Sequence, residues 1–474
     1  MPLPVLIGNH PLLAKEEGQA LLPEWPQRIQ QDCIVAFRRD AADPLAQDSR
    51  IFAQLSERLC PGEGHLLCRV LVQSLQSARL YERIRIPGVE IHPFTLENAW
   101  AESLLGPGGK VPLDGNGIAF EDDVCVRLVL FGMTPAAEAL ALQALKTAHF
   151  PNYIRNHHLR TRITWVDRDA LEGGRRFVAR HKSLMDVSWY RFVDLQAESI
   201  RTHRPELLPG AEEYVDTEWE FVQGNPWDAL LKAKLERWTH AGKWRVTVAF
   251  AYAQDGRNLE AFQYLEGSVG AAPVLLHLED DALSAAAQLP VVPFGMGASF
   301  YGQFLRQRAL AMALNSVYTY TAREGHAPQT LDIREAERLW RDLSPTARRS
   351  SLDSVQCVGV KMRSLGLQEE DWGVLYGMDA QSLDLLSQVE HNRWSVSTLL
   401  AGFRPPTAEE QAAIEKEISL KSEYKARRIH YDLRAYSDLR ADDKGNDSRL
   451  YDIALTECIP LIVHTVAGEG RRDA

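Results

Sequence analysis

The order of apolar and polar positions predicts an α/β region from about residue 124 to 310. Short apolar runs alternate there with longer segments of helical periodicity, a pattern typical of parallel strands joined by crossover helices. The runs are VRLVLFG (126–132), RITWVD (162–167), EWEFVQG (218–224), RVTVAFAY (245–252), APVLLHL (272–278) and LPVVPFG (289–295). We therefore expect a doubly wound parallel sheet.

The turn after the first of these strands is where such a sheet places a phosphate, at the start of the following helix. Against the G-x-G-x-x-G/A pattern, Gly132 and Ala137 are in place, whereas Thr134 replaces the middle glycine. Asp167 ends the next strand, where an acid can hold a ribose hydroxyl, although it lies farther along the chain than the usual ~20 residues. A nucleotide site and a purely structural turn are both open interpretations.

Composition and charge exclude several classes of protein. The 474 residues include 64 acidic and 53 basic side chains, a net charge of −11, which disfavours proteins that coat nucleic acid. The sequence offers neither an apolar run of the ~18 residues that a bilayer requires nor a typical signal peptide. The six cysteines show no paired spacing, so neither a disulfide framework nor a metal site is expected. We expect a cytoplasmic chain without direct membrane insertion.

The start of the chain matches the later part of the α/β region. Four short segments match in order: Ile7-Gly8-Asn9 with Gln223-Gly224-Asn225, Val35-Ala36-Phe37 with Val248-Ala249-Phe250, LLCRVLV (66–72) with APVLLHL (272–278), and His92-Pro93-Phe94 with Val292-Pro293-Phe294. A repeat of this kind starts in the third strand of a first copy, as in a chain that begins mid-domain or is cut from a longer one. Its missing strands would leave a sheet edge open, so we expect a homodimer or higher oligomer.

These tandem units, with VAF strands followed by an aspartate and strands that end in PF, resemble the TrkA-N (RCK) ligand-sensing domains of potassium-transport regulators. The resemblance covers about residues 1–320. It implies Rossmann-like units that dimerise and bind NAD or another adenine nucleotide to gate a channel, without turning the nucleotide over. It also implies that Gly132, Thr134 and Ala137 form the cofactor-binding loop and that Asp167 is the ribose acid.

From about residue 328 the periodicity becomes helical, and the clearest helix is predicted over 382–403, with Gly402 at its end. One stripe of this helix carries Leu385, Val389, Val396 and Leu400 and is the expected core face. His391 and Trp394 lie on the opposite face and need a cover, either the rest of the domain or a planar ligand. The downstream segment KSEYKARRIHYDLRAYSDL mixes cations and tyrosines, which suits either a nucleotide or a solvated basic helix face.

Four segments here together resemble the RyR domain, first named from ryanodine receptors: EHNRW (390–394), GFRP (402–405), H-x-DL-x-x-Y-x-x-L (430–439) and ND-x-R (446–449). The resemblance covers about residues 385–465, and bacterial RyR domains occur fused to TrkA-N units. Tyr431 stands where the family usually has proline. The resemblance implies recognition of a small ligand, adenine nucleotides among them. The implied pocket residues are His391, Arg393, Trp394, Arg404, His430 and Tyr436.

The expected fold class is therefore α/β, with doubly wound parallel-sheet Rossmann-like units, one partial (1–120) and one complete (121–310). A helical connector (311–380) and an all-α RyR-like domain (381–466) follow. The expected function is a non-catalytic sensor of an adenine nucleotide, NAD or an ADP-ribose-like molecule that controls a partner such as an ion channel or effector. No Tyr-x-x-x-Lys relay or HExxH motif indicates an enzyme. The alternatives are an NAD-dependent oxidoreductase with a degenerate dinucleotide site and a protein-binding scaffold.

Overall fold

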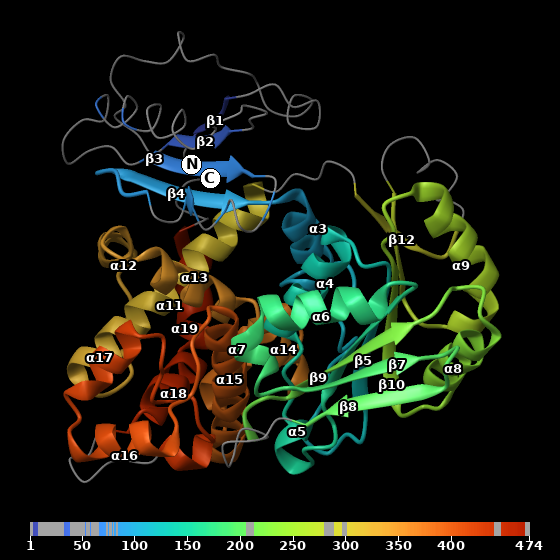
Figure 1. Ribbon diagram of the computed structural model, residues 1–474. Coiled ribbons are helices and arrows are strands. Elements are labelled where there is room, and N and C mark those ends of the chain that lie inside the picture. Colours follow the sequence, from blue (N-terminus) through green and yellow to red (C-terminus); the bar gives the residue numbers. More distant parts are fainter. Residues whose placement is uncertain are drawn as a thin grey trace.

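The computed structural model (Figure 1) contains two sheets and a body of helices. It describes residues 3–7, 33–37, 66–72, 84–204, 213–278, 289–295, 301–439 and 447–469, with isolated positions from 53 to 81. In Figure 1 the N-terminal sheet lies at the top, the α/β half at the lower right and the helical half at the lower left.

The larger sheet has eight strands in the order β12-β11-β10-β5-β6-β9-β7-β8. Its six predicted strands are all present: β5 (Cys125–Phe131), β6 (Thr161–Asp167), β9 (Thr217–Gln223), β10 (Trp244–Phe250), β11 (Val274–His277) and β12 (Val292–Phe294). They pair in parallel, and their chain order across the sheet is 3-2-1-4-5-6, the order of dinucleotide-binding α/β sheets. The expectation of an α/β protein with a mostly parallel sheet is confirmed.

A hairpin that the apolar pattern did not predict extends this sheet. The strands β7 (Trp189–Asp194) and β8 (Ser199–His203) lie in the connection between β6 and β9, with β7 parallel to β9 and β8 antiparallel to β7. Asp194 closes the hairpin by accepting hydrogen bonds from the backbone N–H groups of Gln196 and Ala197. The chain between α4 and β6 contains the short helix α5 (Asn152–Arg155).

Helices cover both faces of the larger sheet. On one face lie α3 (Leu96–Leu105), α4 (Pro135–Thr147), α6 (Ala170–Arg180) and α7 (Lys182–Met185), and on the other lie α8 (Ala229–His240) and α9 (Asp255–Val269). Along β5, Leu128 and Leu130 join the core of the first face, while Val129 and Phe131 join the core of the second. All seven β5 residues are buried, as expected of a parallel strand covered on both sides.

The N-terminal sheet repeats the pairing register of the larger one. Its parallel strands are β1 (Leu3–Ile7), β2 (Cys33–Phe37), β3 (Leu66–Leu71) and β4 (Val89–Phe94), in that order. Ala36, Arg69 and His92 stand in one row across β2-β3-β4, as Ala249, Leu275 and Val292 do across β10-β11-β12. Each residue of the first row is the one that the sequence repeat aligns with the corresponding residue of the second row. The match of Ile7-Gly8-Asn9 with the end of β9 is not reflected in the strand order. In the N-terminal sheet β1 lies next to β2, whereas in the larger sheet the neighbour of β10 is β5 and not β9. Gly8 and Asn9 themselves lie outside the described residues.

The helix that follows the last strand of each sheet makes contacts with the other sheet. After β4, α3 packs on α4 and brings Trp100 to His277 at the end of β11, with 5.5 Å between ring centroids. After β12, α11 (Tyr301–Glu324) brings Phe304 to His92 on β4, with 5.1 Å between ring centroids. Arg308 of α11 also binds the buried carboxylate of Glu90, at 2.6 Å. This exchange fixes the N-terminal sheet against the rest of the chain.

The helical half is built around α15 (Ala380–Leu400), which begins at its cap Asp379 and ends before Gly402 (φ 86°), close to the predicted bounds. The other members are α11, α12 (Ile333–Arg341), α13 (Pro345–Val355), α14 (Val358–Ser364), η4 (Glu369–Gly377), α16 (Ala408–Lys416), α17 (Leu420–Ala426), η5 (Tyr436–Leu439), α18 (Arg449–Glu457) and α19 (Ile459–Glu469). The segment predicted as a connector packs with the rest, since α11 contacts α13, α18 and α19.

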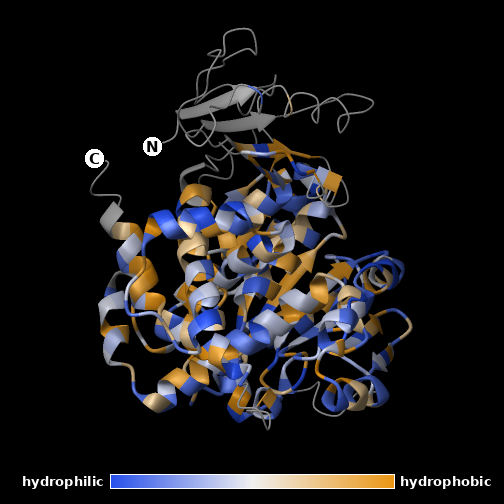
Figure 2. Ribbon diagram, turned by 90° about the vertical axis from the view of Figure 1, so that its left-hand side faces the viewer, coloured by the Kyte–Doolittle hydropathy of each residue, from blue (hydrophilic) through white to orange (hydrophobic). Residues whose placement is uncertain are grey.

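Figure 2 shows hydrophobic residues alternating with hydrophilic ones along these helices, as expected where one helix face is buried. Among the described helices, none is by itself long and apolar enough to cross a membrane, and α18 and α19 pass that test only as a pair bent by 45°.

Candidate functional site

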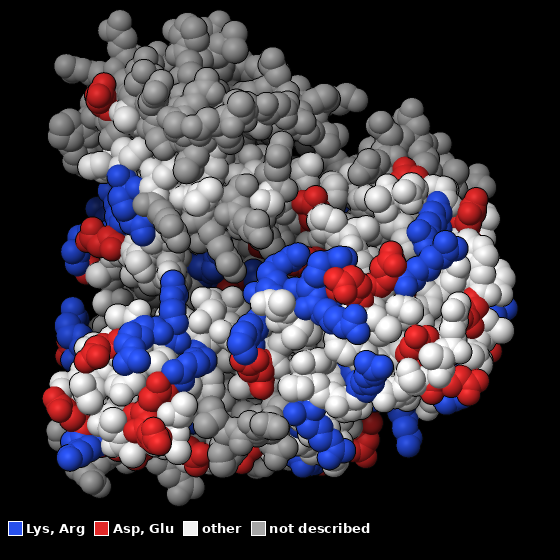
Figure 3. Space-filling model, in the orientation of Figure 1, with Lys and Arg blue, Asp and Glu red and all other residues white. Residues whose placement is uncertain are grey.

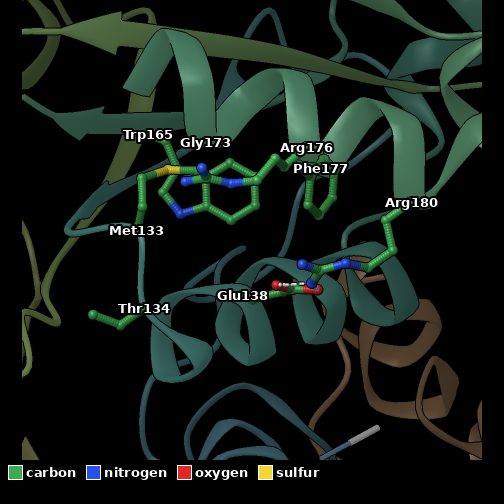
Figure 4. A pocket seen from close by; sticks show the side chains of 8 residues that line it. All are labelled: Met133, Thr134, Glu138, Trp165, Gly173, Arg176, Phe177 and Arg180. Carbon is green, nitrogen blue, oxygen red and sulfur yellow. Dashed lines mark hydrogen bonds and ion pairs between the residues drawn. The ribbon is translucent and has the colours of Figure 1, made fainter. Parts of the chain in front are cut away.

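A crevice opens between α4 and α6 at the carboxyl edge of β5 and β6 (Figure 4). It encloses about 370 Å³, including space open to solvent. Its lining comprises Met133, Thr134, Glu138, Trp165, Gly173, Arg176, Phe177 and Arg180. Thr134 is the one residue among these that the sequence indicated as a site residue.

The predicted phosphate turn forms one end of the crevice. Gly132 has φ 102°, and a Cβ there would lie 2.9 Å from the carbonyl oxygen of Ala251, so the turn requires glycine. The Thr134 hydroxyl donates to that same oxygen at 2.5 Å and accepts from the N–H of Ala137 at 3.2 Å. Because Pro135 lacks an N–H and Thr134 occupies that of Ala137, this helix start offers fewer free donors than a glycine-rich turn.

Close packing of α6 shapes the crevice from the other side. A Cβ on Gly173 would lie 2.7 Å from the Cε of Met133, so a side chain at this position would have to displace the Met133 side chain from the crevice. The floor is formed by Trp165, which is 1% exposed and packs against Phe177. The indole N–H of Trp165 has no hydrogen-bond partner among the described residues, and an unpaired buried donor is costly. In the view of Figure 4 the Arg176 side chain crosses the Trp165 ring.

The two arginines that line the crevice differ in how closely they are paired with carboxylates. Arg180 contacts both carboxylate oxygens of Glu138 at 2.6 Å. Burial alone would raise the pKa of Glu138, but the hydrogen bonds from His181 and Arg180 lower it. Arg176, with a side chain 62% exposed, lies 3.6 Å from Glu172. Figure 3 shows basic side chains across α6, interspersed with acidic ones. Arg176 is thus the cation available to an anionic ligand.

The other predicted cofactor residues do not line the crevice. Ala137 is fully buried in the first turn of α4. Asp167 is half-buried and accepts a hydrogen bond from the backbone N–H of Asp169 at 3.0 Å. Its charge acts on Tyr252: burial raises the pKa of that tyrosine, Arg257 lowers it and Asp167 raises it further. The structure therefore brings Asp167 near the end of β10, beside the turn.

In the helical half, four of the six predicted pocket residues form one cluster of rings. Trp394 stacks on His391 with 5.6 Å between ring centroids, and its edge meets His430 at 4.9 Å. Tyr436 lies 5.9 Å from His391. His391, His430 and Tyr436 are buried and Trp394 is half-buried. The expected cover over His391 is thus the protein's own segment 430–436.

Of the predicted core stripe, Val389 and Val396 are buried, but so is the opposite face at His391, because α15 is enclosed on nearly all sides.

The hydrogen bonds of His391 show that it is not the base of a nucleophilic triad. Its Nε2 lies 2.8 Å from the carbonyl oxygen of Arg434 and its Nδ1 lies 3.3 Å from the carboxylate of Asp452. Burial raises the pKa of Asp452, partly opposed by His391. Ser395 is buried with its Oγ 3.5 Å from Nε2. Because Nε2 donates to the carbonyl, it cannot accept a proton from that serine.

The remaining two predicted pocket residues lie elsewhere. Arg393 is buried and donates to Glu390 at 2.7 Å, and Lys361 binds the same carboxylate at 2.7 Å. Burial alone would raise the pKa of Glu390, but these two cations lower it to about 2. Arg404 lies at the surface and forms a bidentate pair with Glu410 at 2.7 Å. Both guanidinium groups thus bind carboxylates outside the ring cluster.

Buried polar contacts connect α4 to the helical half. The side chain of Gln143 donates to Gln356 at 3.0 Å, and Lys146 pairs with Asp353 at 2.9 Å. Asp353 also accepts a hydrogen bond from Ser397 of α15 at 3.0 Å. One end of α4 thus forms the crevice while the other end is bonded to α13 and, through Asp353, to α15.

No protein-family model matches the chain, and a comparison with curated proteins finds no match. The TrkA-N and RyR resemblances therefore stay predictions. The sequence reasoning also missed every residue of the crevice lining except Thr134, and α6 supplies half of that lining. The available signal was the segment Gly173-Gly174-Arg175-Arg176, where two small residues allow close packing and two cations follow.

Proposed function

We propose that the chain is a ligand-sensing regulator that binds a nucleotide-type molecule, an adenine nucleotide or an ADP-ribose-like compound, in the crevice between α4 and α6. The main observation in support of this proposal is the location of the crevice in the fold. It lies at the carboxyl edge of a sheet of order 3-2-1-4-5-6, on the β6 side of the switch point between β5 and β10 at which open α/β sheets bind their ligands. Arg176 offers a cation for a phosphate, and the Trp165 indole offers a wall and an unpaired N–H.

The same geometry favours a smaller ligand over NAD. A dinucleotide bound in the usual way crosses from the first strand to the fourth, here from β5 to β10. At that point the Thr134 hydroxyl is bonded to the carbonyl oxygen of Ala251. A ligand confined to the β6 side leaves this bond intact. The obstacle also weighs against the alternative of an NAD-dependent oxidoreductase.

The sensing step follows from the two ends of α4. A ligand that moves the first turn of α4 acts on Gln143 and Lys146 near its last turns, and these residues are bonded to the helical half. A helix transmits such a shift because its backbone is a continuous hydrogen-bonded rod. We propose that a partner protein, such as an ion channel or effector, or a second copy of the chain, responds to the helical half. A protein-binding scaffold without a ligand is the competing function.

The first experiment identifies the ligand. The purified chain is heat-denatured and the released small molecules are identified by mass spectrometry, followed by thermal-shift measurements with AMP, ATP, ADP-ribose and NAD. A ligand at a hundredfold excess over its Kd raises the free energy of unfolding by about 2.7 kcal/mol. We expect stabilisation by a mononucleotide or ADP-ribose at lower concentration than by NAD. No released molecule and no shift with any of the four would support the scaffold.

A matched pair of variants then locates the site. Arg176→Ala removes the cation that lines the crevice, while Arg175→Ala removes its neighbour on the same helix, which is equally exposed and also 3.6 Å from Glu172. Loss of a charge-assisted hydrogen bond weakens binding by roughly tenfold to a hundredfold, so Arg176→Ala should raise the Kd by that factor and Arg175→Ala should not. Equal effects of the two variants would move the site away from the crevice.

A third variant tests transmission. Lys146→Met combined with Asp353→Leu replaces the ion pair between α4 and α13 with apolar side chains and leaves the crevice lining intact. Hydrogen exchange of α15 is measured with and without ligand. We expect unchanged affinity but loss of the ligand-dependent change in exchange. A preserved change in α15 would mean that the signal does not pass through this end of α4.

A further inference from the structure

Within the described residues, a buried arginine without an anionic partner lies at the amino edge of the larger sheet, opposite the crevice. Arg160 immediately precedes β6 and is 7% exposed. Its Nε is buried and has no hydrogen-bond partner in the part of the chain that the structure describes, and no carboxylate there forms an ion pair with its guanidinium. The guanidinium carbon lies 5.7 Å from the ring centroid of Tyr153 and 5.3 Å from that of Trp189. A buried guanidinium normally has a carboxylate or another acceptor.

The neighbours of Arg160 add further unpaired donors. The indole N–H of Trp189 is buried and has no partner among the described residues. The guanidinium carbon of Arg204 lies 5.0 Å from the ring centroid of Trp189, and this arginine is exposed and has no ion pair within the described ranges. Arg160 precedes β6, Trp189 begins β7, and Arg204 follows the antiparallel β8. All three therefore meet at the amino edge of the sheet.

We propose that Arg160, Trp189 and Arg204 form a binding site for an anionic group, a carboxylate or a phosphate. Two guanidinium groups and an indole N–H are donors with no acceptor among them. The complement of such a set is a group with only acceptor oxygens, which planar guanidinium groups bind well. The contacts with Tyr153 and Trp189 hold the Arg160 guanidinium in place and leave its hydrogen-bond donors for the anion.

This site is separate from the crevice and does not rest on the proposed function. The seven residues of β6 lie between Arg160 and the carboxyl edge, about 20 Å at ~3.3 Å per residue. One anion cannot contact both Arg160 and Arg176. Substitutions can therefore disrupt one site and leave the other site intact.

The test titrates inorganic phosphate and acetate, at constant ionic strength against chloride, into the full chain carrying Arg176→Ala. This background removes the cation of the crevice. Binding is measured by calorimetry and by the rise in melting temperature. We expect saturable binding of at least one of the two anions. Phosphate alone would assign a phosphate ester as the natural ligand, and acetate alone a carboxylate.

Adding Arg160→Met should weaken this binding at least tenfold, and Trp189→Phe, which keeps a ring and removes the N–H, should weaken it severalfold. Arg160→Lys keeps the positive charge and serves if the methionine variant fails to fold; we expect it to bind more weakly than arginine because it lacks the planar fork. Arg175→Ala is the control and should bind as the background does. No saturable binding in the background, or binding unchanged by the Arg160 and Trp189 substitutions, would overturn the proposal.

Discussion

Lys146 near the end of α4 and Asp353 on α13 form an ion pair of 2.9 Å across the boundary between the α/β half and the helical half. Burial alone would raise the pKa of Asp353, but the charge of Lys146 lowers it. Ser397 of α15 donates to the same carboxylate. Three helices thus meet at one carboxylate, and one of them, α4, begins at the crevice.

Removing one partner of this pair should cost more stability than removing both. Lys146→Met leaves the carboxylate of Asp353 buried without its cation, and we expect a loss of about 2–3 kcal/mol, below the 3–5 kcal/mol of a fully buried pair because Lys146 is half-buried. The double variant Lys146→Met/Asp353→Leu should recover most of the loss. Urea unfolding of the wild type, both single variants and the double variant measures this. Strictly additive effects would show that the two residues are not coupled.

The stability of the helical half should fall as the pH is lowered from about 6.5 to about 4. Burial lowers the pKa of His430 to about 4, with Asp432 opposing the shift and Lys425, Lys421 and His391 adding to it. The unfolded chain takes up the proton near pH 6.5 and the folded chain only near 4, so the stabilisation is present above 6.5 and is lost on acidification. The full effect is about 3 kcal/mol.

Urea unfolding at a series of pH values checks this slope. Because glutamine cannot titrate, His430→Gln should flatten the pH dependence of the free energy of unfolding between pH 6.5 and 4. The loss of stability below pH 4, which comes from the protonation of carboxylates such as Glu390, should remain. An unchanged slope in the variant would assign the dependence to another group.

Six strands of the larger sheet could be predicted because each is a short, largely apolar run, as expected of parallel strands buried on both faces. The hairpin could not be predicted in this way. The residues of β7 are mostly half-buried and those of β8 are mostly polar and exposed. The polar strand β8 (SIRTH) produces no apolar run, so the largely apolar β7 (WYRFVD) has no apolar partner that would indicate a hairpin. Pairing of β7 with β9 and of β8 with β7 places both strands at the sheet edge.

Part of the candidate site followed from sequence and part required the fold. The resemblance to the RyR domain grouped His391, Trp394, His430 and Tyr436, and the structure brings these four residues together. That their cover is the chain itself depends on the path of 430–436 and could not be read from the sequence. The crevice depends on α6 packing beside α4, which is a tertiary relationship. The partners of Arg393 and Arg404 likewise come from folding.

Arg393 and Arg404, which the RyR resemblance assigns to one pocket, should differ sharply in their effect on stability. Arg393→Met leaves the buried Glu390 with Lys361 as its remaining cation and should cost about 3 kcal/mol or more. Arg404→Ala removes an exposed pair with Glu410 and should cost less than about 1 kcal/mol. Chemical denaturation compares them. A small loss for Arg393→Met would mean that its buried pair contributes little.

Trp394→Ala should destabilise the protein even though the residue lies opposite the predicted core stripe. Trp394 is half-buried between His391 and His430, and truncation should cost about 2–3 kcal/mol, below the 3–5 kcal/mol of a fully buried tryptophan. Trp394→Phe keeps a ring and should lose less. Thermal unfolding with and without nucleotide measures both effects. Full stability of Trp394→Ala with loss of ligand response would instead place the ligand in the ring cluster.

Gly132→Ala should damage both the fold and the crevice. With φ 102°, Gly132 holds a backbone conformation that a side chain strains, and the added Cβ would lie 2.9 Å from the carbonyl oxygen of Ala251. We expect a loss of about 1–3 kcal/mol and weaker nucleotide binding, because that oxygen also accepts the Thr134 hydroxyl. The matched control is Gly256→Ala in α9, where a Cβ meets nothing within 4 Å and the helical backbone favours alanine by up to about 1 kcal/mol. Urea unfolding and nucleotide titration of both variants decide the matter. Equal stability of the two variants would show that the turn after β5 tolerates a side chain and that its glycine does not shape the crevice.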